Sequence, residues 1–309
     1  ICYLVTPYDE TYALRFGAIA RIRERDIHTE TTPRWGGVAM WFATSFTFVV
    51  VSHLPLVGKS FGREAQGIFL AGTFVVLLGM IDDRFELDAL TKLAGQALAA
   101  GILLSFGVQL LWLPINGLIT LPASIGQFLT VLVILVAINA VNFIDGMDGL
   151  ASGIVAVSAT AFFIFAYVLA VVYGFNRAGA PSTMSAVLIG VCLGFLPHNY
   201  HPAKIFMGDS GAMLLGLLLS ASAITLTGQI DINAITGSST TTMLPLLLPF
   251  AVLAIPLLDL GLAVVRRVRA GRSPFAADSE HIHHKLLDMG LSHRRTAGIL
   301  YLWTAVFAI

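Results

Sequence analysis

Long uncharged stretches alternate with short polar segments along the whole chain. A membrane-spanning helix needs about 20 mainly apolar residues, and several stretches are apolar all round, whereas a soluble helix has a one-sided stripe. The pattern predicts about ten transmembrane helices, of which the first, ending near Pro7, and the last are expected to be truncated. The later spans are expected at residues 35–55, 64–81, 89–113, 123–143, 149–174, 182–197, 210–228, 243–266 and 295–309.

Composition supports the same fold class. Hydrophobic residues make up 57% of the chain and charged residues only 12%, about half the charged fraction of ordinary soluble domains. The two cysteines, Cys2 and Cys192, lie far apart among apolar residues, a spacing that fits neither a disulfide framework nor a metal motif. We therefore expect an all-α polytopic integral membrane protein, with one transmembrane domain over residues 1–309.

The charged residues indicate an orientation. When the expected connections are numbered alternately, all but three of the 18 Lys and Arg residues fall in one set, the exceptions being Lys59, Arg63 and Arg177. Cytoplasmic loops carry such an excess. The same set holds the acidic corners and every histidine except His53, which predicts an active-site cleft at the cytoplasmic face.

Adjacent carboxylates stand at the end of one expected span, in "GMIDDRFELDALTKLAGQ". Asp82 and Asp83 repel one another, and a hard cation such as Mg²⁺, which prefers carboxylate oxygens and shares its shell with phosphates, would relieve the repulsion. The alternative is a solvated loop, in which Asp88 caps the next helix. We favour a functional role for the pair, because charges beside hydrocarbon are costly, and a capping role for Asp88.

A second acidic corner reads "NAVNFIDGMDGL". A helix cap would explain one aspartate, but it does not explain Asn142, Asp145 and Asp148 at intervals of three. Glycines beside them permit a tight turn, and the N–H groups at a helix start attract phosphate. This corner is predicted to bind a phosphate-bearing ligand or a metal.

Two further polar segments follow. "HPAKIFMGDSG" places Asp209 at the start of a span, either as a ligand or as a helix cap. "HIHHKLL" contains His281, His283 and His284 but lacks the cysteines or the H-E-x-x-H spacing of zinc sites. Phosphate binding, proton transfer and a solvated loop remain open for these histidines. Asp259 lies within a span and requires a partner or a watery cavity.

These motifs, in this order between spans, resemble the polyprenyl-phosphate N-acetylhexosamine-1-phosphate transferases over about residues 28 to 295. "TTPRWGG" and "HIHHKLL" are more similar to the GlcNAc-1-phosphate branch than to the peptidoglycan branch, which usually has "PTMGG" and a longer histidine run. "VRRVRAGRSPF" and "SHRR" look similar to actinobacterial members.

The resemblance implies roles for individual residues. Asp82 would activate the lipid phosphate, Phe206 would stack on uracil and Asn199 would contact the nucleoside. The implied catalytic residues are Asp82, Asp83, Asp145, Asp148, Asp209, His281, His283 and His284. The implied substrate-binding residues are Thr32, Arg34, Lys92, Asn142, Asn199 and Phe206. The implied metal ligands are Asp209, Asp83 and Asp148, holding Mg²⁺ with Mn²⁺ as a substitute.

The implied reaction transfers GlcNAc-1-phosphate from UDP-GlcNAc to a polyprenyl phosphate (undecaprenyl or decaprenyl) and releases UMP, as the first membrane step of cell-envelope polysaccharide synthesis. The enzyme would lie in the bacterial plasma membrane with its site facing the cytoplasm. A homodimer is a candidate assembly, and no nucleic-acid partner is expected.

Three alternatives stay open at this point. One is phospho-MurNAc-pentapeptide transfer, within the same family. Another is a divalent-cation or anion transporter, because intramembrane acids mark ion pathways. "DGMDGLASG" also suggests a CDP-alcohol phosphotransferase, but that reading needs further aspartates in residues 149–174, which contain none.

Overall fold

A computed structural model describes residues 1–19, 32–54, 62–113, 119–172, 178–229, 254–271 and 282–308. Its helices are α1 (Cys2–Phe16), α2 (Gly36–Ser52), α3 (Arg63–Phe85), α4 (Ala89–Ser105), α5 (Ala123–Ile144), α6 (Leu150–Val171), α7 (Gly179–Asn199), α8 (Gly208–Gln229), α10 (Ala254–Arg269), α11 (Ile282–Asp288) and α12 (His293–Ala308). Strands β1 (Trp112–Leu113) and β2 (Ile119–Thr120) form a small antiparallel hairpin.

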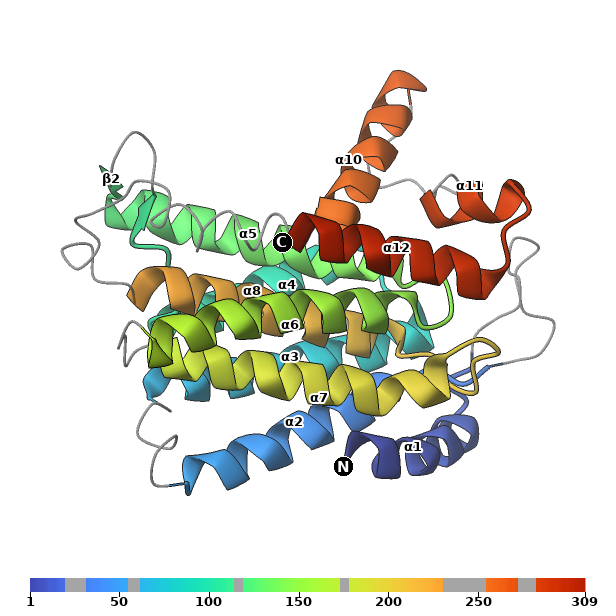
Figure 1. Cartoon of the computed structure of the whole chain (residues 1–309), viewed down its shortest axis with the longest axis horizontal. Coiled ribbons are helices and arrows are strands. Elements are labelled where there is room, and N and C mark those ends of the chain that lie inside the picture. Colours follow the sequence, from blue (N-terminus) through green and yellow to red (C-terminus); the bar gives the residue numbers. More distant parts are fainter. Residues whose placement is uncertain are drawn as a thin grey trace.

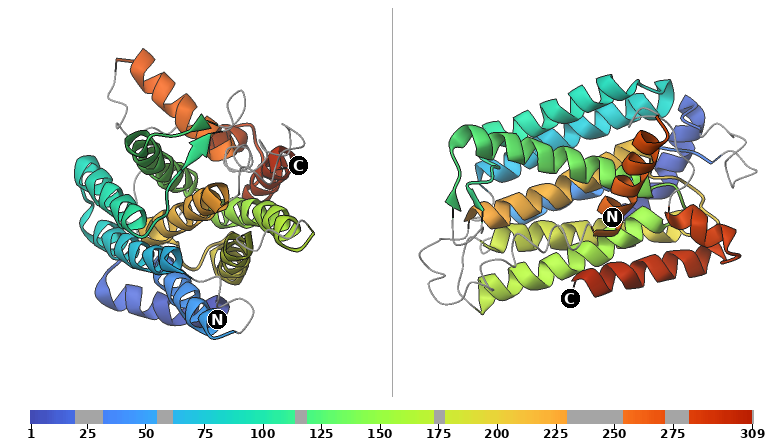
Figure 2. Two further views of the ribbon diagram at one scale, coloured as in Figure 1. Left: turned by 90° about the vertical axis from the view of Figure 1, so that its left-hand side faces the viewer. Right: turned by 90° about the horizontal axis from the view of Figure 1, so that it is seen from above.

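Five of the described helices, α3, α5, α6, α7 and α8, are long and apolar enough to cross a membrane. They run side by side in one bundle (Figures 1 and 2). Helix α8 is the central helix: its apolar window is wholly buried, whereas the windows of the other four are buried over only 39–50%. This arrangement is typical of a polytopic membrane protein, in which the outer helices present apolar side chains to lipid.

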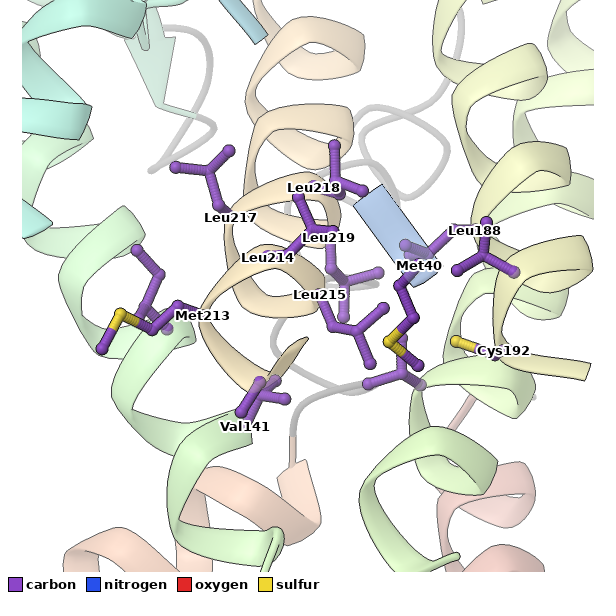
Figure 3. Close-up of a cluster of buried hydrophobic side chains, with 14 of the residues drawn as sticks. Met40, Val141, Leu188, Cys192, Met213, Leu214, Leu215, Leu217, Leu218 and Leu219 are labelled. Atoms are coloured by element: carbon purple, nitrogen blue, oxygen red, sulfur yellow. The ribbon is translucent and has the colours of Figure 1, made fainter. Parts of the chain in front are cut away.

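Side chains from several helices surround α8. Met213 and the five leucines at positions 214, 215, 217, 218 and 219 lie among Val141 of α5, Met40 of α2 and two residues of α7, Leu188 and Cys192 (Figure 3). Helices in lipid associate through close packing rather than through hydrophobic exclusion, so small residues are favoured where backbones meet. The glycines around α8 meet this requirement.

Two of these glycines set the position of the polar end of the bundle. A Cβ atom added at Gly79 of α3 would lie 2.3 Å from Cα of Ser210 in α8. One added at Gly37 of α2 would lie 2.2 Å from the backbone nitrogen of Gly211. Because neither contact admits a side chain, α2 and α3 are held against the first turn of α8.

The helix boundaries depart from expectation in three places. Helix α1 continues past Pro7 to Phe16, so the expected end near Pro7 is wrong. Helix α3 runs to Phe85, which places Asp82 and Asp83 in its last turn rather than in a loop. Helix α4 stops at Ser105, where the sequence pattern predicted continuation to 113, because the apolar run continues as extended chain into β1. Residues 243–253 of the ninth expected span lie outside the described residues.

The C-terminal helices pack on the outside of this bundle. Helix α12 lies along α6, and α10 contacts α5 near its base and projects away from the other helices (Figure 1). Asp259 of α10 is buried, and its carboxylate accepts a hydrogen bond of 2.9 Å from the Ile282 N–H at the start of α11. One partner that Asp259 was expected to require is therefore a backbone group.

Candidate active site

Four helices bring their polar residues together at one end of the bundle. Lys92, on α4, lies with its ammonium 2.6 Å from Oδ2 of Asp82 and in contact with Oδ2 of Asp209. The Asn142 amide, on α5, donates to the other oxygen of Asp209. A lysine, an amide and two carboxylates from α3, α4, α5 and α8 thus form one network. Two of its members, Lys92 and Asp209, lie 117 positions apart in the sequence.

The two adjacent aspartates of α3 have different surroundings. Asp83 accepts hydrogen bonds from the backbone N–H groups of Asp209 (2.9 Å) and Ser210 (3.3 Å) and from the Ser210 hydroxyl (3.1 Å). It therefore satisfies the first N–H groups of α8, which have no partner within that helix. Asp82 instead pairs with Lys92 and accepts the Leu87 N–H at 2.8 Å.

Asp209 does not cap its own helix. Asp83 satisfies the first turn of α8, and the Asp209 side chain turns toward Lys92 and Asn142. Its carboxylate keeps 27% exposure within an otherwise buried segment. The capping alternative for Asp209 is thus not the arrangement found, whereas Asp88 does cap α4, accepting the N–H groups of Leu90 and Thr91 at 3.0 Å.

Asp145 lies in the turn between α5 and α6, beyond the end of the span. Burial raises the pKa of its carboxyl well above the usual range, and the nearby charges of Asp209 and Asp83 raise it further, against an opposing effect of Arg34. Within the described residues, no hydrogen-bond donor is found for this carboxylate. A carboxylate that is partly buried, beside other acids and without a donor is well suited to a cation.

Asp148 occupies the same turn but is enclosed, with a side-chain exposure of 1%. Its Oδ2 accepts hydrogen bonds from Nδ1 of His201 at 2.8 Å and from the Ala203 N–H at 3.1 Å. The N-cap of α6 is the next residue, Gly149, whose φ of 71° is in the left-handed region that favours glycine. Asp148 thus joins the α5–α6 turn to the α7–α8 connection.

The residues predicted to contact the nucleoside lie in that connection. Asn199 is buried, and its amide accepts the Gly149 N–H at 3.1 Å and donates to the Ile205 carbonyl at 3.0 Å. The Phe206 backbone pairs with Pro33 (2.9 Å) and with Gly36 (3.0 Å). Asn199 therefore fixes the loop that presents Phe206.

The remaining predicted residues are only partly placed. Thr32 is buried beside Pro33, and the charge of Arg34 acts on Asp145. His281 lies outside the described residues, as do the side chains of His283 and His284, whose backbone belongs to α11. The roles predicted for the histidines stay predictions.

The donor set fits Mg²⁺ only in part. Among the described residues, no group of three His, Cys, Asp or Glu side chains encloses a metal position. Mg²⁺ usually takes one or two carboxylates and completes its shell with water and substrate phosphates. Asp145, without a donor, and Asp209, whose side chain is 27% exposed and bonds to the side chains of Lys92 and Asn142, meet that requirement better than Asp83 or Asp148, whose oxygens already accept backbone N–H groups.

The sequence motifs indicate no role for His201. Its hydrogen bond to Asp148 spans 53 residues, so no local spacing could have indicated the pair. The available signal was the clustering of polar and aromatic residues in "HNYHP", directly before the segment that ends in Asp209.

The sequence is similar to those of known membrane transferases. Residues 65–227 match the profile of glycosyl transferase family 4. The chain is 44% identical to a decaprenyl-phosphate N-acetylglucosaminephosphotransferase of Mycolicibacterium smegmatis, over 100% of this chain and 78% of that protein. It is 31% identical to a probable undecaprenyl-phosphate N-acetylglucosaminyl 1-phosphate transferase of Bacillus subtilis, over 99% and 80% of the two chains. It is 32% identical to a phospho-N-acetylmuramoyl-pentapeptide-transferase of Desulforudis audaxviator, over 95% and 87%. The chain belongs to glycosyl transferase family 4.

Proposed function

We propose that this enzyme transfers GlcNAc-1-phosphate from UDP-GlcNAc to a polyprenyl phosphate, forming polyprenyl-diphospho-GlcNAc and UMP. The 44% identity over the whole chain favours this reaction over pentapeptide-bearing substrates, which are used by a relative at 32%. Decaprenyl phosphate is the first acceptor to test, with undecaprenyl phosphate second. The observation that carries the proposal is the network of Lys92, Asp82, Asp209 and Asn142 at one end of a bundle of apolar helices.

The network suits an acceptor that is itself anchored in lipid. An oxygen of the polyprenyl phosphate attacks the phosphorus that bears the sugar, the bond to the UMP oxygen breaks, and UMP leaves with that bonding pair. Lys92 supplies positive charge for the incoming phosphate, and Asp82 orients it and accepts its remaining proton. A phosphate monoester has a second pKa of about 6, so most of the nucleophile is already a dianion near neutral pH and no covalent enzyme intermediate is needed.

Mg²⁺, or Mn²⁺ in its place, is the proposed cofactor. Bound to the diphosphate, it would neutralise charge that develops on the departing UMP. Asp209 and Asp145 are the residues best placed to hold it, while the assignment of Asp83 and Asp148 as ligands stays a prediction. Asp83 accepts hydrogen bonds from the first backbone N–H groups of α8. Asp148 accepts them from His201 and the Ala203 N–H.

The charge distribution supports a bacterial plasma-membrane location, with about ten spans in a single transmembrane transferase domain and the network facing the cytoplasm, where UDP-sugars occur. Two exposed serines test the orientation: Ser292, directly before His293 at the start of α12, and Ser52, at the opposite end of the bundle where α2 ends. A cysteine at Ser292 should react with an impermeant maleimide only from the cytoplasmic side, and one at Ser52 only from outside. The native cysteines are buried and should give a low background; reversed labelling would contradict the orientation.

The reaction is tested with purified protein, Mg²⁺, decaprenyl phosphate and radiolabelled UDP-GlcNAc. We expect label in an organic-extractable diphosphate lipid and one UMP per lipid formed. UDP-GalNAc and UDP-MurNAc-pentapeptide are tested as alternative donors under the same conditions. Preferential use of UDP-MurNAc-pentapeptide would show that the proposed donor, UDP-GlcNAc, is wrong. Protein that forms no lipid product from any donor but moves ions across vesicles would support the transporter alternative.

A further inference from the structure

The turn that carries Asp148 is held from outside the bundle by the C-terminal helix. On α12, the Tyr301 hydroxyl donates to the Gly149 carbonyl at 2.6 Å. A Cβ atom at Gly153 of α6 would lie 2.1 Å from the Tyr301 ring, so α12 rests directly on the α6 backbone. Helix α12 lies beyond the segment that matches the family profile, residues 65–227.

His201 connects this outer helix to the acidic turn. Its ring stacks on the ring of His293, the first residue of α12, with centroids 4.3 Å apart and planes 6° from parallel. The guanidinium of Arg294 donates to the His201 carbonyl at 3.4 Å and lies over the Tyr200 ring at 5.7 Å. The ring of His201 is thus fixed on one face while its Nδ1 reaches Asp148.

We propose that His201 is a positioning residue for Asp148, held in place by His293 and Arg294 of α12. The inference rests on the proposed function, because it assigns Asp148 to the nucleotide-binding turn of the transferase. Nδ1 acts as the donor in this pair, since an ionised carboxylate can only accept. Together with the Ala203 N–H, it fixes the plane of a carboxylate that has almost no contact with water.

The alternative is that His201 only fills space at a helix junction. The two roles differ in what they require of the side chain. A space-filling role requires an aromatic ring against His293, whereas a positioning role requires a hydrogen-bond donor at the Nδ1 position. Removal of outer-shell partners that orient site residues typically lowers activity by about 10- to 100-fold.

Four variants separate these requirements. In His201→Asn the amide nitrogen can take the place of Nδ1, so the donor is kept and the ring is lost. His201→Phe keeps a ring and loses the donor, and His201→Gln places its amide near the Nε2 position instead. His53→Asn is the matched control, because His53 is exposed at the far end of α2 and, in the part of the chain that the structure describes, its ring bonds to Ser52 and Val49 of the same helix.

We expect His201→Phe and His201→Gln to lower kcat/KM for UDP-GlcNAc by about 10- to 100-fold, with the KM for decaprenyl phosphate unchanged. His201→Asn should recover most of that loss, and His53→Asn should match the wild type. Melting temperatures identify any variant that fails to fold, in which case the other donor-free variant carries the comparison.

The inference is overturned if the Asn variant is as impaired as the Phe variant, if Phe preserves activity, or if the losses fall equally on both substrates. Failure of the proposed function looks different. If the wild type prefers another UDP-sugar, the variants are compared on that donor, and the same Asn-against-Phe contrast still decides the role of His201. A wild type that transfers from no UDP-sugar overturns both ideas.

Discussion

The two acidic corners look alike in sequence but are built differently in space. Asp82 and Asp83 lie in the last turn of α3, and Asp145 and Asp148 lie in the turn between α5 and α6. In each corner one carboxylate is committed to other parts of the protein: Asp83 accepts from the first turn of α8, and Asp148 accepts from His201 and Ala203. Of the other two carboxylates, Asp82 accepts the Leu87 N–H and pairs with Lys92 of the network, and Asp145 has no donor among the described residues.

This difference indicates that Asp83 and Asp148 hold the fold together, whereas the other carboxylates act on substrate or metal. A carboxylate that accepts backbone N–H groups and loses its charge keeps an acceptor oxygen but makes weaker hydrogen bonds, because each hydrogen bond to a charged group contributes about 1.5–3 kcal/mol. Asp145, which lies beside other acids and has no donor among the described residues, is costly to keep ionised and is retained for another reason, which here we take to be substrate and metal. We therefore expect substitutions of Asp83 and Asp148 mainly to lower the stability of the fold. Substitutions of Asp82, Asp145 and Asp209 should mainly lower the turnover number.

Metal removal should have the largest effect, because it removes the ion that Asp145 and Asp209 would hold together. Exhaustive EDTA treatment should abolish transfer, and added Mg²⁺ or Mn²⁺ should restore it. Mg²⁺ should also raise the melting temperature of the wild type, since a ligand that binds the folded state stabilises it. That shift should be lost in Asp209→Asn and in Asp145→Asn, and kept in Asp83→Asn. Full activity without metal would contradict the assignment of Asp145 and Asp209 as metal ligands.

Exchanges within the α3 pair come next in size. Asp82→Asn should lower kcat by about 10²- to 10⁴-fold, the usual contribution of a general base. Its residual activity should rise with pH through the second phosphate pKa of about 6. Asp83→Asn should lower the melting temperature further than Asp82→Asn, because it disturbs the start of α8.

The same pair distinguishes direct attack from a covalent route. Enzyme without lipid acceptor should release no stoichiometric burst of UMP. A burst of one equivalent that is lost in Asp82→Asn or Asp83→Asn would show that a carboxylate attacks first. Our assignment of Asp82 to orienting the lipid phosphate would then be wrong.

Local pattern was sufficient to predict much of this molecule. Uncharged stretches predicted the long helices, and the polar residues at their ends predicted which side chains would meet. The sequence could not show that Asp83 rather than Asp209 caps α8, because that bond joins residues 126 positions apart. It also could not show that Pro7 lies within α1, since a proline in the early turns of a helix can be accommodated by packing.

The hydrogen-bond partners of the residues in and before the α5–α6 turn could not be predicted from the local sequence either. Intervals of three among Asn142, Asp145 and Asp148 predicted a shared site, but the residues face different neighbours. Asn142 binds Asp209, and Asp148 binds His201. Which acid is enclosed depends on how α6, α7 and α12 pack together, and that is a property of the tertiary structure.

The smallest expected effect lies in the pH dependence of stability without metal. Burial and neighbouring acids raise the pKa of Asp145 in the folded protein, whereas an aspartate in an unfolded chain titrates near about 3.9. Between these two values the folded state binds more protons than the unfolded state, so stability falls as pH rises, by at most about 1.4 kcal/mol per pH unit. Asp145→Asn removes this group and should flatten the slope.

The matched variant for this test is Asp148→Asn. It removes the charge that holds His201 and Ala203, so it should melt at a lower temperature than the wild type across the range while keeping the slope due to Asp145. Melting curves in detergent with EDTA, from pH 5 to pH 8, provide the measurement. If the curves of wild type and Asp145→Asn fall in parallel with pH, Asp145 is not the uncompensated acid of this corner. If Asp148→Asn flattens the slope instead, the two aspartates have the opposite roles.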